Sequence, residues 1–171
     1  MRTEHVVVLP YDAQWAAEFE KIKAEIMAAV GDLVIGMEHV GSTAVPGLSA
    51  KPCIDMDAVI RDMRVFDAVA QRLAAIGYIH EGNLGIEGRE AFRYTDKPHL
   101  LTHHLYVCPQ NSAELHRHLV FRDFLRTHPE AVRQYSAVKE EAARLYPNDI
   151  ERYIAYKSPC IEALYRQCGL G

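Results

Sequence analysis

Long apolar runs and an excess of basic charge are both missing from this chain of 171 residues. Its apolar stretches are far shorter than the roughly 20 residues that cross a bilayer. The start from Met1 to His5 lacks the apolar core of a secretory signal. Lysine and arginine number 19 against 23 acidic residues, so the formal charge is −4. We therefore expect a soluble, cytoplasmic protein without a membrane partner, and the charge gives no support for a nucleic-acid partner.

Paired cysteine motifs are also missing. The four cysteines are scattered and form no C-x-x-C pair: Cys53, Cys108, Cys160 and Cys168. This spacing signals neither a zinc site nor a disulfide framework, so we interpret the cysteines as reduced, mostly structural thiols.

Repeats, low-complexity segments and long Gly/Ser/Pro-rich linkers do not occur either. With 49% hydrophobic and 25% charged residues, the composition is typical of a single globular domain. We expect one domain over residues 1–171, with an α/β core at 1–108 and C-terminal helices at 109–171.

Apolar periodicity predicts the elements of this domain. After Asp12, a possible cap, five apolar residues recur at helical spacing: Trp15, Phe19, Ile22, Ile26 and Val30. Strand patterns cover 6–9, 33–40, 53–60, 78–80, 91–95 and 101–108, and helical patterns cover the segment from Val65 to Ile76, about 112–127, about 129–146 and the end from 149. Pro159 predicts a kink or a new start in the last helix. The order indicates an α/β (α+β) fold with a mixed sheet, helices around it and a helical C-terminal portion.

Two acidic residues lie on one side of the 53–60 strand. Because side chains alternate in a strand, Asp55 and Asp57 face away from Ile54 and Met56. Their Cα atoms are about 6.6 Å apart along the strand. Such a pair suits a hard cation, Mg²⁺ or Mn²⁺. The alternative interpretation of D-x-D is a solvated strand edge or a turn with capping roles.

Upstream of this pair, Gly41 and Ser42 offer a backbone that approaches closely, free N–H donors and a hydroxyl. A bound triphosphate needs these groups. Together with the carboxylates and a metal, they indicate a phosphoryl- or nucleotidyl-transfer site.

The block from Gly41 to Met56 closely resembles the signature of the GrpB family, in the nucleotidyltransferase (polymerase-β-like) superfamily. The resemblance continues through Arg89–Arg93, His104–Val107, Phe121–Arg126, Pro129, Tyr135, Lys139 and Tyr153–Lys157. It implies a nucleotidyltransferase-like mixed sheet, a Gly41-Ser42 turn that grips phosphates, and a metal held by Asp55 and Asp57.

One feature departs from that pattern. Nucleotidyltransferases usually add a third carboxylate from a nearby strand, but the 101–108 strand contains His103 and His104 and no acid. The open alternatives for the catalytic base are His104, Glu90 and Asp96. His103 and His104 are adjacent in a strand and cannot both ligate one ion from there.

Several cations lie on otherwise apolar helix faces or follow the Gly-rich connection at 82–88. Each either binds phosphate or forms an internal ion pair, for example with Asp123 or Glu140. The candidate phosphate-binding residues are Gly41, Ser42, Thr43, Lys51, Arg89, Arg93, Arg122, Lys139 and Lys157.

The function predicted from these residues is a Mg²⁺-dependent (or Mn²⁺-dependent) nucleotidyltransferase. It would transfer a nucleotidyl group from a nucleoside triphosphate to a small acceptor, with Asp55, Asp57 and His104 as catalytic residues. The main alternative is a noncatalytic nucleotide- or phosphometabolite-binding module of the same fold, and a third is a metal-dependent phosphohydrolase. Ser42 lacks the G-x-S-x-G context of a hydrolase nucleophile.

Overall fold

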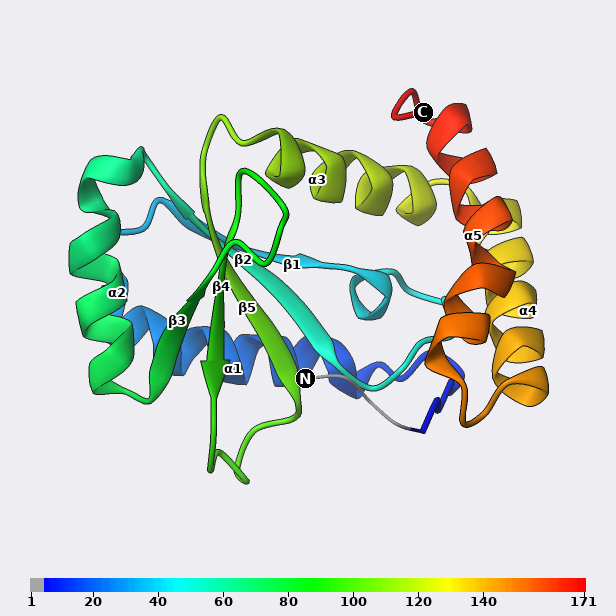
Figure 1. Ribbon diagram of the computed structural model, residues 1–171, viewed down its shortest axis with the longest axis horizontal. Helices are drawn as coiled ribbons and strands as arrows, with labels where there is room; N and C mark the ends of the chain where they lie inside the picture. The colour runs from blue at the N-terminus through cyan, green and yellow to red at the C-terminus, as the bar shows by residue number, and fades with distance from the viewer. Residues whose placement is uncertain (1–4) are drawn as a thin grey trace.

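A computed structural model describes residues 5–171; residues 1–4, on which parts of the expected domain and of the start considered for a secretory signal fall, lie outside the described residues. Within the described part, a region that contains both helices and strands comes first, and further helices follow (Figure 1). The elements are α1 (Gln14–Val30), β1 (Gly36–Val40), η1 (Ser42–Ala44), β2 (Ile54–Ile60), η2 (Met63–Val65), α2 (Phe66–Ala75), β3 (Tyr78–Gly82), β4 (Glu90–Tyr94), β5 (His103–Pro109), α3 (Ala113–Arg126), α4 (Pro129–Leu145) and α5 (Ile150–Gln167).

The five strands form one sheet in the order β1-β2-β5-β4-β3. β2 and β5 run parallel, whereas the other neighbours are antiparallel. The predicted mixed sheet with flanking helices is therefore confirmed. The register places Asp55 of β2 opposite His104 of β5, so two residues 49 positions apart lie side by side.

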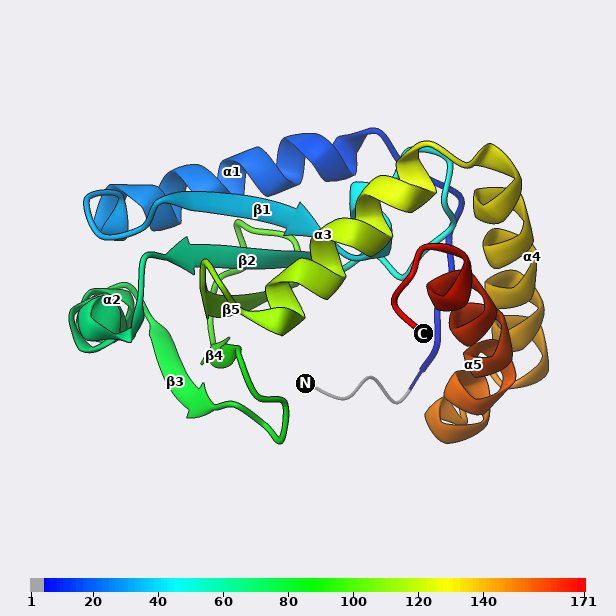
Figure 2. The same cartoon turned by 90° about the horizontal axis from the view of Figure 1, so that it is seen from above.

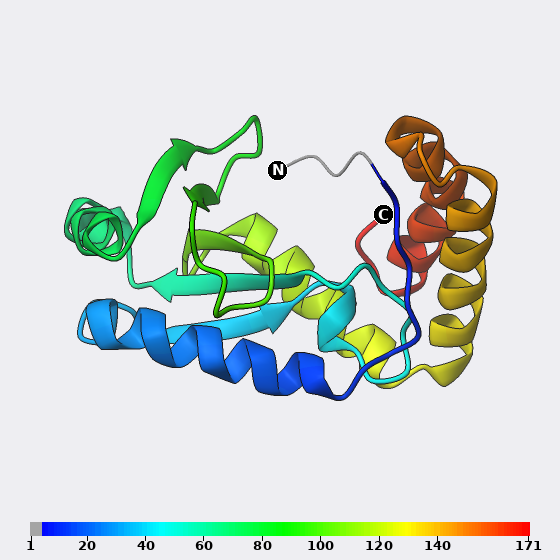
Figure 3. The same ribbon diagram turned by 90° about the horizontal axis from the view of Figure 1, so that it is seen from below.

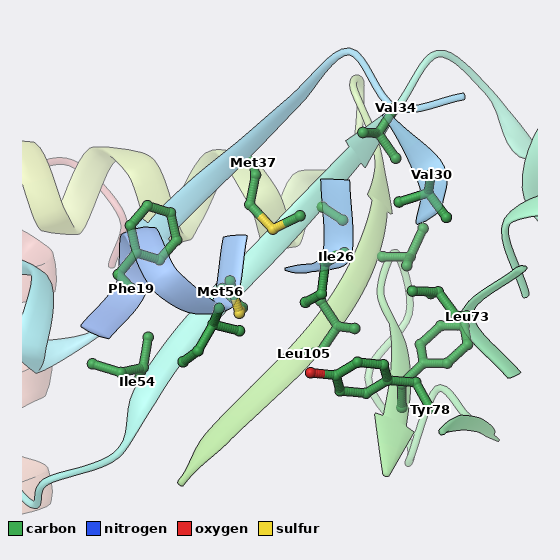
Figure 4. Close-up of a cluster of buried hydrophobic side chains, with 14 of the residues drawn as sticks. Phe19, Ile26, Val30, Val34, Met37, Ile54, Met56, Leu73, Tyr78 and Leu105 are labelled. Atoms are coloured by element: carbon green, nitrogen blue, oxygen red, sulfur yellow. The ribbon is translucent and has the colours of Figure 1, made fainter. Parts of the chain in front are cut away.

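The main core lies on one face of this sheet, under α1 and α2. The apolar residues predicted on α1 are buried as expected, and they pack with the alternate residues of β2 (Figure 4). Helix α3 covers the other face, where Leu115 contacts Val59 and Cys108. Figures 2 and 3 show α1 and α3 on opposite sides of β1 and β2. The alternation in β2 therefore directs Asp55 and Asp57 toward the α3 side.

Helices α4 and α5 lie side by side beyond the end of the sheet at which β1 ends and β2 begins (Figures 1 and 2). A second apolar cluster fixes them there, because Val45 and Leu48 of the loop after β1 pack against Val132, Tyr135 and Leu164. The loop that carries Gly41 and Ser42 is thereby held against the C-terminal helices.

Two sequence-based expectations need correction. The segment from Val6 to Leu9 is not a strand, since its ladder is limited to one bridge between Leu9 and Ala50, and the Val6 N–H donates instead to the Pro147 carbonyl. Helix α5 continues through Pro159, so the new helix start considered at this residue does not occur. None of the helices described is long and apolar enough to span a membrane.

Two isoleucines in the sheet give a matched test of the core. Ile60 at the end of β2 is fully buried, whereas Ile79 of β3 is 43% exposed. We expect Ile60→Ala to lower the free energy of unfolding by about 2–5 kcal/mol, because it removes buried methyl groups and leaves a cavity. Ile79→Ala removes the same β-branched side chain and should cost clearly less. Urea denaturation of both variants checks this, and equal losses would contradict the assigned core.

Candidate functional site

Strand β2 gives its two carboxylates different surroundings. Asp55 is partly exposed, whereas Asp57, two residues further on, lies under α3 with no exposed surface. Both point to the same face, as the alternation predicted, because Ile54 and Met56 fill the core on the other face. The site therefore has an open carboxylate and a closed one.

The closed carboxylate is held by a histidine. His118 Nδ1 donates to Asp57 Oδ2 at 2.6 Å, and His118 Nε2 lies 3.1 Å from Glu114 Oε1 one turn earlier in α3. Burial opposes protonation of His118, but the hydrogen bond and charge of Asp57, with Glu114, raise its pKa. Burial raises the pKa of Asp57, which His118 and Arg89 counteract.

The surroundings of the second Asp57 oxygen differ from those of a carboxylate in an ordinary ion pair. Oδ1 is buried and has no hydrogen-bond partner among the residues described. Buried carboxylate oxygens are costly unless they are paired or coordinate a metal. Oxygen donors are those that Mg²⁺ and Mn²⁺ prefer. Asp55 and Asp57 therefore fit a hard divalent cation by the chemistry of their donors.

The open carboxylate pairs with His104 across the β2–β5 register. Asp55 Oδ1 lies 2.9 Å from His104 Nδ1. The hydrogen bond to Asp55, followed by the contact with Cys53, raises the pKa of His104 to about 9. A base with a near-neutral pKa was expected here, whereas this imidazole carries a proton at neutral pH and has to lose it before it can accept another.

Gly41 allows the loop after β1 to approach Asp55. Its φ is +73°, a conformation that residues with a side chain rarely adopt. A Cβ at this position would lie 2.5 Å from Asp55 Oδ2. The close approach thus depends on glycine, and it places Ser42, the first residue of η1, next to the open carboxylate.

A cavity of about 250 Å³ opens beside Asp55, Ser42 and His104. Three lysines line it from the loop before β2 and from the two C-terminal helices: Lys51, Lys139 and Lys157. Among the described residues that line it, Asp55 is the one carboxylate. With His104 protonated, the wall carries a clear excess of positive charge, which suits a polyanion.

Lys139 is the most unusual of these lysines, because its side chain is 3% exposed. Its Nζ contacts Ser42 Oγ, donates to the Ser49 carbonyl at 3.3 Å and lies 4.4 Å from the centre of the Tyr135 ring. Burial, together with repulsion from Lys157, lowers the pKa of Lys139 to about 7. Burial and Lys51 likewise lower the pKa of Lys157. Neither lysine has a carboxylate partner within ion-pair distance in the described chain.

Two further cavities adjoin the first. One of about 200 Å³ shares Ser42 and Asp55 with it and is lined by Arg117, His118 and Arg122. The other, of about 180 Å³, shares His104 and is lined mainly by aromatic and apolar residues of β4 and β5. Asp55 and His104 therefore lie where the three cavities adjoin one another.

Most of the residues singled out in the sequence come together around these hollows. The first cavity collects Ser42, Thr43, Lys51, Asp55, His104, Lys139 and Lys157, and the second collects Gly41 and Arg122. Arg122 also forms ion pairs with Glu38 at 2.6 Å and Asp123 at 2.9 Å. Of the two interpretations of the cations, phosphate binding and an internal ion pair, the ion pair is therefore observed for this residue.

Two predicted cations lie elsewhere. The Arg89 guanidinium stacks 4.1 Å from the centre of the Tyr106 ring, where its charge acts on Asp57. Arg93 is exposed and lines the aromatic cavity. Neither lines the lysine-rich cavity.

The two carboxylates considered as alternative catalytic bases do not lie opposite Asp55 in the sheet. Glu90 pairs with His80 at 2.9 Å and lies opposite Val107, three residues along β5 from His104. Asp96 is exposed beyond the end of β4. His104 is the group that the register places beside Asp55.

Sequence reasoning missed His118 and Glu114. Their spacing of four residues on a helix is a readable local signal for a side-chain pair. The contact of His118 with Asp57 spans 61 residues and follows only from the packing of α3 over β2. The histidine pattern in the sequence directed attention to His103 instead, whose ring is buried and bonds the Tyr78 hydroxyl at 2.7 Å.

Comparisons with known proteins agree with this architecture. A family model described as GrpB protein matches residues 5–167. The UPF0157 protein YqkA of Bacillus subtilis (strain 168) is 33% identical over 157 residues, and the match covers 92% of this chain but 45% of YqkA, so the chain spans less than half of that relative.

Two solved structures resemble the fold. The conserved protein GrpB from Enterococcus faecalis superposes with a TM-score of 0.79 at 29% identity, covering 94% of this chain and 98% of that one. The Cid1 poly(U) polymerase with MgGTP bound gives a TM-score of 0.55 at 13% identity, covering 79% and 44%. The second likeness concerns the fold alone. The chain therefore belongs to the GrpB family and has a nucleotidyltransferase-like fold.

Proposed function

We propose that this protein binds a nucleoside triphosphate together with Mg²⁺ or Mn²⁺ and transfers its nucleotidyl group to a small acceptor. The observation that carries the proposal is the convergence of Ser42, the carboxylate of Asp55 and three lysines on one cavity, with Gly41 bringing the Ser42 loop close to Asp55. Such a set neutralises the negative charge of a polyphosphate while leaving its reacting phosphate accessible.

The lysine-rich cavity is the proposed site of the outer phosphates. Lys139 and Lys157 extend from neighbouring helices, and Lys51 extends from the loop before β2. Among the described residues, Lys139 is buried with no carboxylate within ion-pair distance, and a buried lysine in such surroundings is destabilising until an anion arrives. A bound triphosphate supplies that anion, and Ser42 Oγ, which already contacts Lys139 Nζ, supplies a further hydrogen bond.

Asp55 and Asp57 are the residues that would hold the metal. When bound, the ion would supply charge neutralisation at the transferring phosphate. Gly41 keeps the backbone close enough for Ser42 to share the site with Asp55. His118 orients Asp57 from the α3 side and leaves the buried Oδ1 without a hydrogen-bond partner among the described residues. His104 holds the proton at Nδ1 against Asp55 and is the proposed group for proton exchange with the acceptor.

A second candidate function is a noncatalytic binding module with the same pocket. The observation that favours it is the position opposite Asp55 in β5, where His104 stands and no carboxylate is present. A protonated imidazole is a poor base. Such a module would bind the triphosphate with metal and leave it intact, whereas the third alternative, a phosphohydrolase, would release phosphate without an acceptor.

The paired carboxylates give the decisive test. We expect Asp55→Asn combined with Asp57→Asn to abolish Mg²⁺-dependent triphosphate binding, because the oxygen ligands lose their charge, while circular dichroism stays native. Isothermal titration with each common nucleoside triphosphate measures this. Asp32→Asn is the matched control, since Asp32 forms a surface ion pair with Arg72 and should not affect binding. Undiminished binding in the double variant refutes the assignment, and pyrophosphate release across an acceptor panel separates the transferase from the module.

Gly41 offers a sharper probe of the close approach. Gly41→Ala places a methyl group against Asp55 Oδ2, so we expect triphosphate affinity with Mg²⁺ to fall at least about tenfold, equivalent to about 1.4 kcal/mol. Gly85→Ala is the control, because Gly85 has a similar φ of +84° but open space within 4 Å of where a Cβ would lie. Both positions have a positive φ, which an alanine adopts only with strain. If both bind the triphosphate equally, the approach of Gly41 to Asp55 plays no part.

Lys139 predicts a pH dependence. Its pKa of about 7 in the free protein rises when phosphate binds, so binding above neutral pH takes up a proton. Lys157 repels the Lys139 charge and Asp55 stabilises it. Triphosphate affinity should therefore fall between about pH 7 and about pH 8, by up to about tenfold for one proton.

Calorimetry in buffers of different ionisation enthalpy measures this proton uptake. Lys139→Met should lose most of the pH slope and bind more weakly, yet its thermal midpoint at neutral pH should stay the same or rise, because a buried charge has been removed. An unchanged slope in Lys139→Met, or a slope of opposite sign in the native protein, contradicts the role assigned to this lysine.

A further inference from the structure

Cys53 brings a soft donor to a site whose other ligands are hard. It is 6% exposed and lines the lysine-rich cavity beside Asp55 and His104. One ligand atom from each of these three residues lies within 4.8 Å of the other two. Sequence spacing does not signal this set, because the cysteines lack a metal motif and His104 comes from another strand.

Two of the three donor separations are close to those of a tetrahedral metal site. Cys53 Sγ lies 3.8 Å from each of the two ring nitrogens of His104, and Nδ1 is the one that also faces Asp55. With metal–sulfur and metal–nitrogen bonds of about 2.3 Å and about 2.05 Å, a tetrahedral angle separates sulfur and nitrogen by about 3.6 Å. Asp55 Oδ1 lies 2.9 Å from the same nitrogen, so this pair has to open by only about half an ångström.

We propose that Cys53, Asp55 and His104 form a site for a thiophilic divalent cation, with Zn²⁺ as the ion that fits it. The ion bonds to Cys53 Sγ, His104 Nδ1 and an Asp55 oxygen. The thiol proton and the proton between His104 and Asp55 leave to solvent, so thiolate, imidazole and carboxylate become the ligands. The fourth position faces the cavity and takes water, as in zinc sites with three protein ligands.

This site differs from the proposed magnesium site in its chemistry. Thiolate and imidazole select zinc-type ions, whereas Mg²⁺ prefers oxygen ligands alone. Asp55 belongs to both sets, so the two ions are alternatives at this carboxylate. Binding of the thiophilic ion does not depend on the proposed nucleotide function, because none of its ligands is supplied by a nucleotide.

Cobalt titration of the metal-free, full-length protein tests the proposal without any nucleotide. We expect Co²⁺ to give a thiolate-to-cobalt charge-transfer band in the near ultraviolet, which Zn²⁺ abolishes by displacing Co²⁺ and excess Mg²⁺ leaves in place. Cys53→Ser should lose the band, and His104→Gln should weaken Co²⁺ binding by about tenfold or more. Cys160→Ser is the matched control, because this thiol lies on α5 outside the cluster, and it should keep the band.

A second measurement on the native protein removes the dependence on variants. Zn²⁺ should protect Cys53 from alkylation, as read by peptide mass mapping, and leave Cys160 unprotected. A missing thiolate band, a band that survives Cys53→Ser, or equal alkylation of Cys53 with and without Zn²⁺ overturns the site. Failure of Mg²⁺–triphosphate binding while the thiolate band persists counts only against the proposed function.

Discussion

Carboxylates on a strand at the centre of the molecule are costly to bury, and the groups around β2 are arranged to offset that cost. Asp57 is sealed under α3, where His118 donates to one oxygen and Arg89 contributes charge. Asp55 stays partly open and shares a proton with His104 across the sheet register. The surroundings of these two carboxylates depend on the placement of α3, on the parallel pairing of β2 with β5 and on the glycine turn after β1.

The C-terminal helices add the opposite problem, buried positive charge. Lys139 is almost completely enclosed by apolar and hydroxyl groups, and its pKa falls to about 7. A protein that needed only to be stable would be better served by an apolar residue here. The apolar cluster of Val45, Leu48 and Leu164 compensates for this cost by locking the helices to the loop that carries Ser42. The conflict between stability and buried charge is what supports an anionic ligand for the cavity.

Asp55 is a ligand in both of the proposed metal sites. Its oxygens face a glycine turn on one side and a histidine with a nearby thiol on the other. Hard and soft cations would therefore share the Asp55 carboxylate as a ligand. The hard ion would use Asp57 as its other ligand, and the soft ion would use Cys53 and His104. The thiophilic ion would displace the proton between His104 and Asp55 and compete with the hard ion for the Asp55 carboxylate, so the two proposed ions are alternatives at this residue.

Local pattern was enough to predict the helices, most strands and the shared face of Asp55 and Asp57, because apolar periodicity follows directly from helical and strand geometry. It failed for the segment from Val6 to Leu9, where branched residues favour a strand but only one bridge forms. A strand requires partner backbone along its length, and that depends on what lies beside it.

The amino-acid sequence by itself therefore determined which side chains share a face of β2 and which glycine can turn toward them. Only the tertiary structure decided that His118 closes over Asp57, that Lys139 is enclosed beside Ser42, and that Cys53 meets His104. Each of these contacts joins residues at least 51 positions apart. Periodicity fixes the direction of a side chain within its own element, whereas such partners are fixed by how whole elements pack.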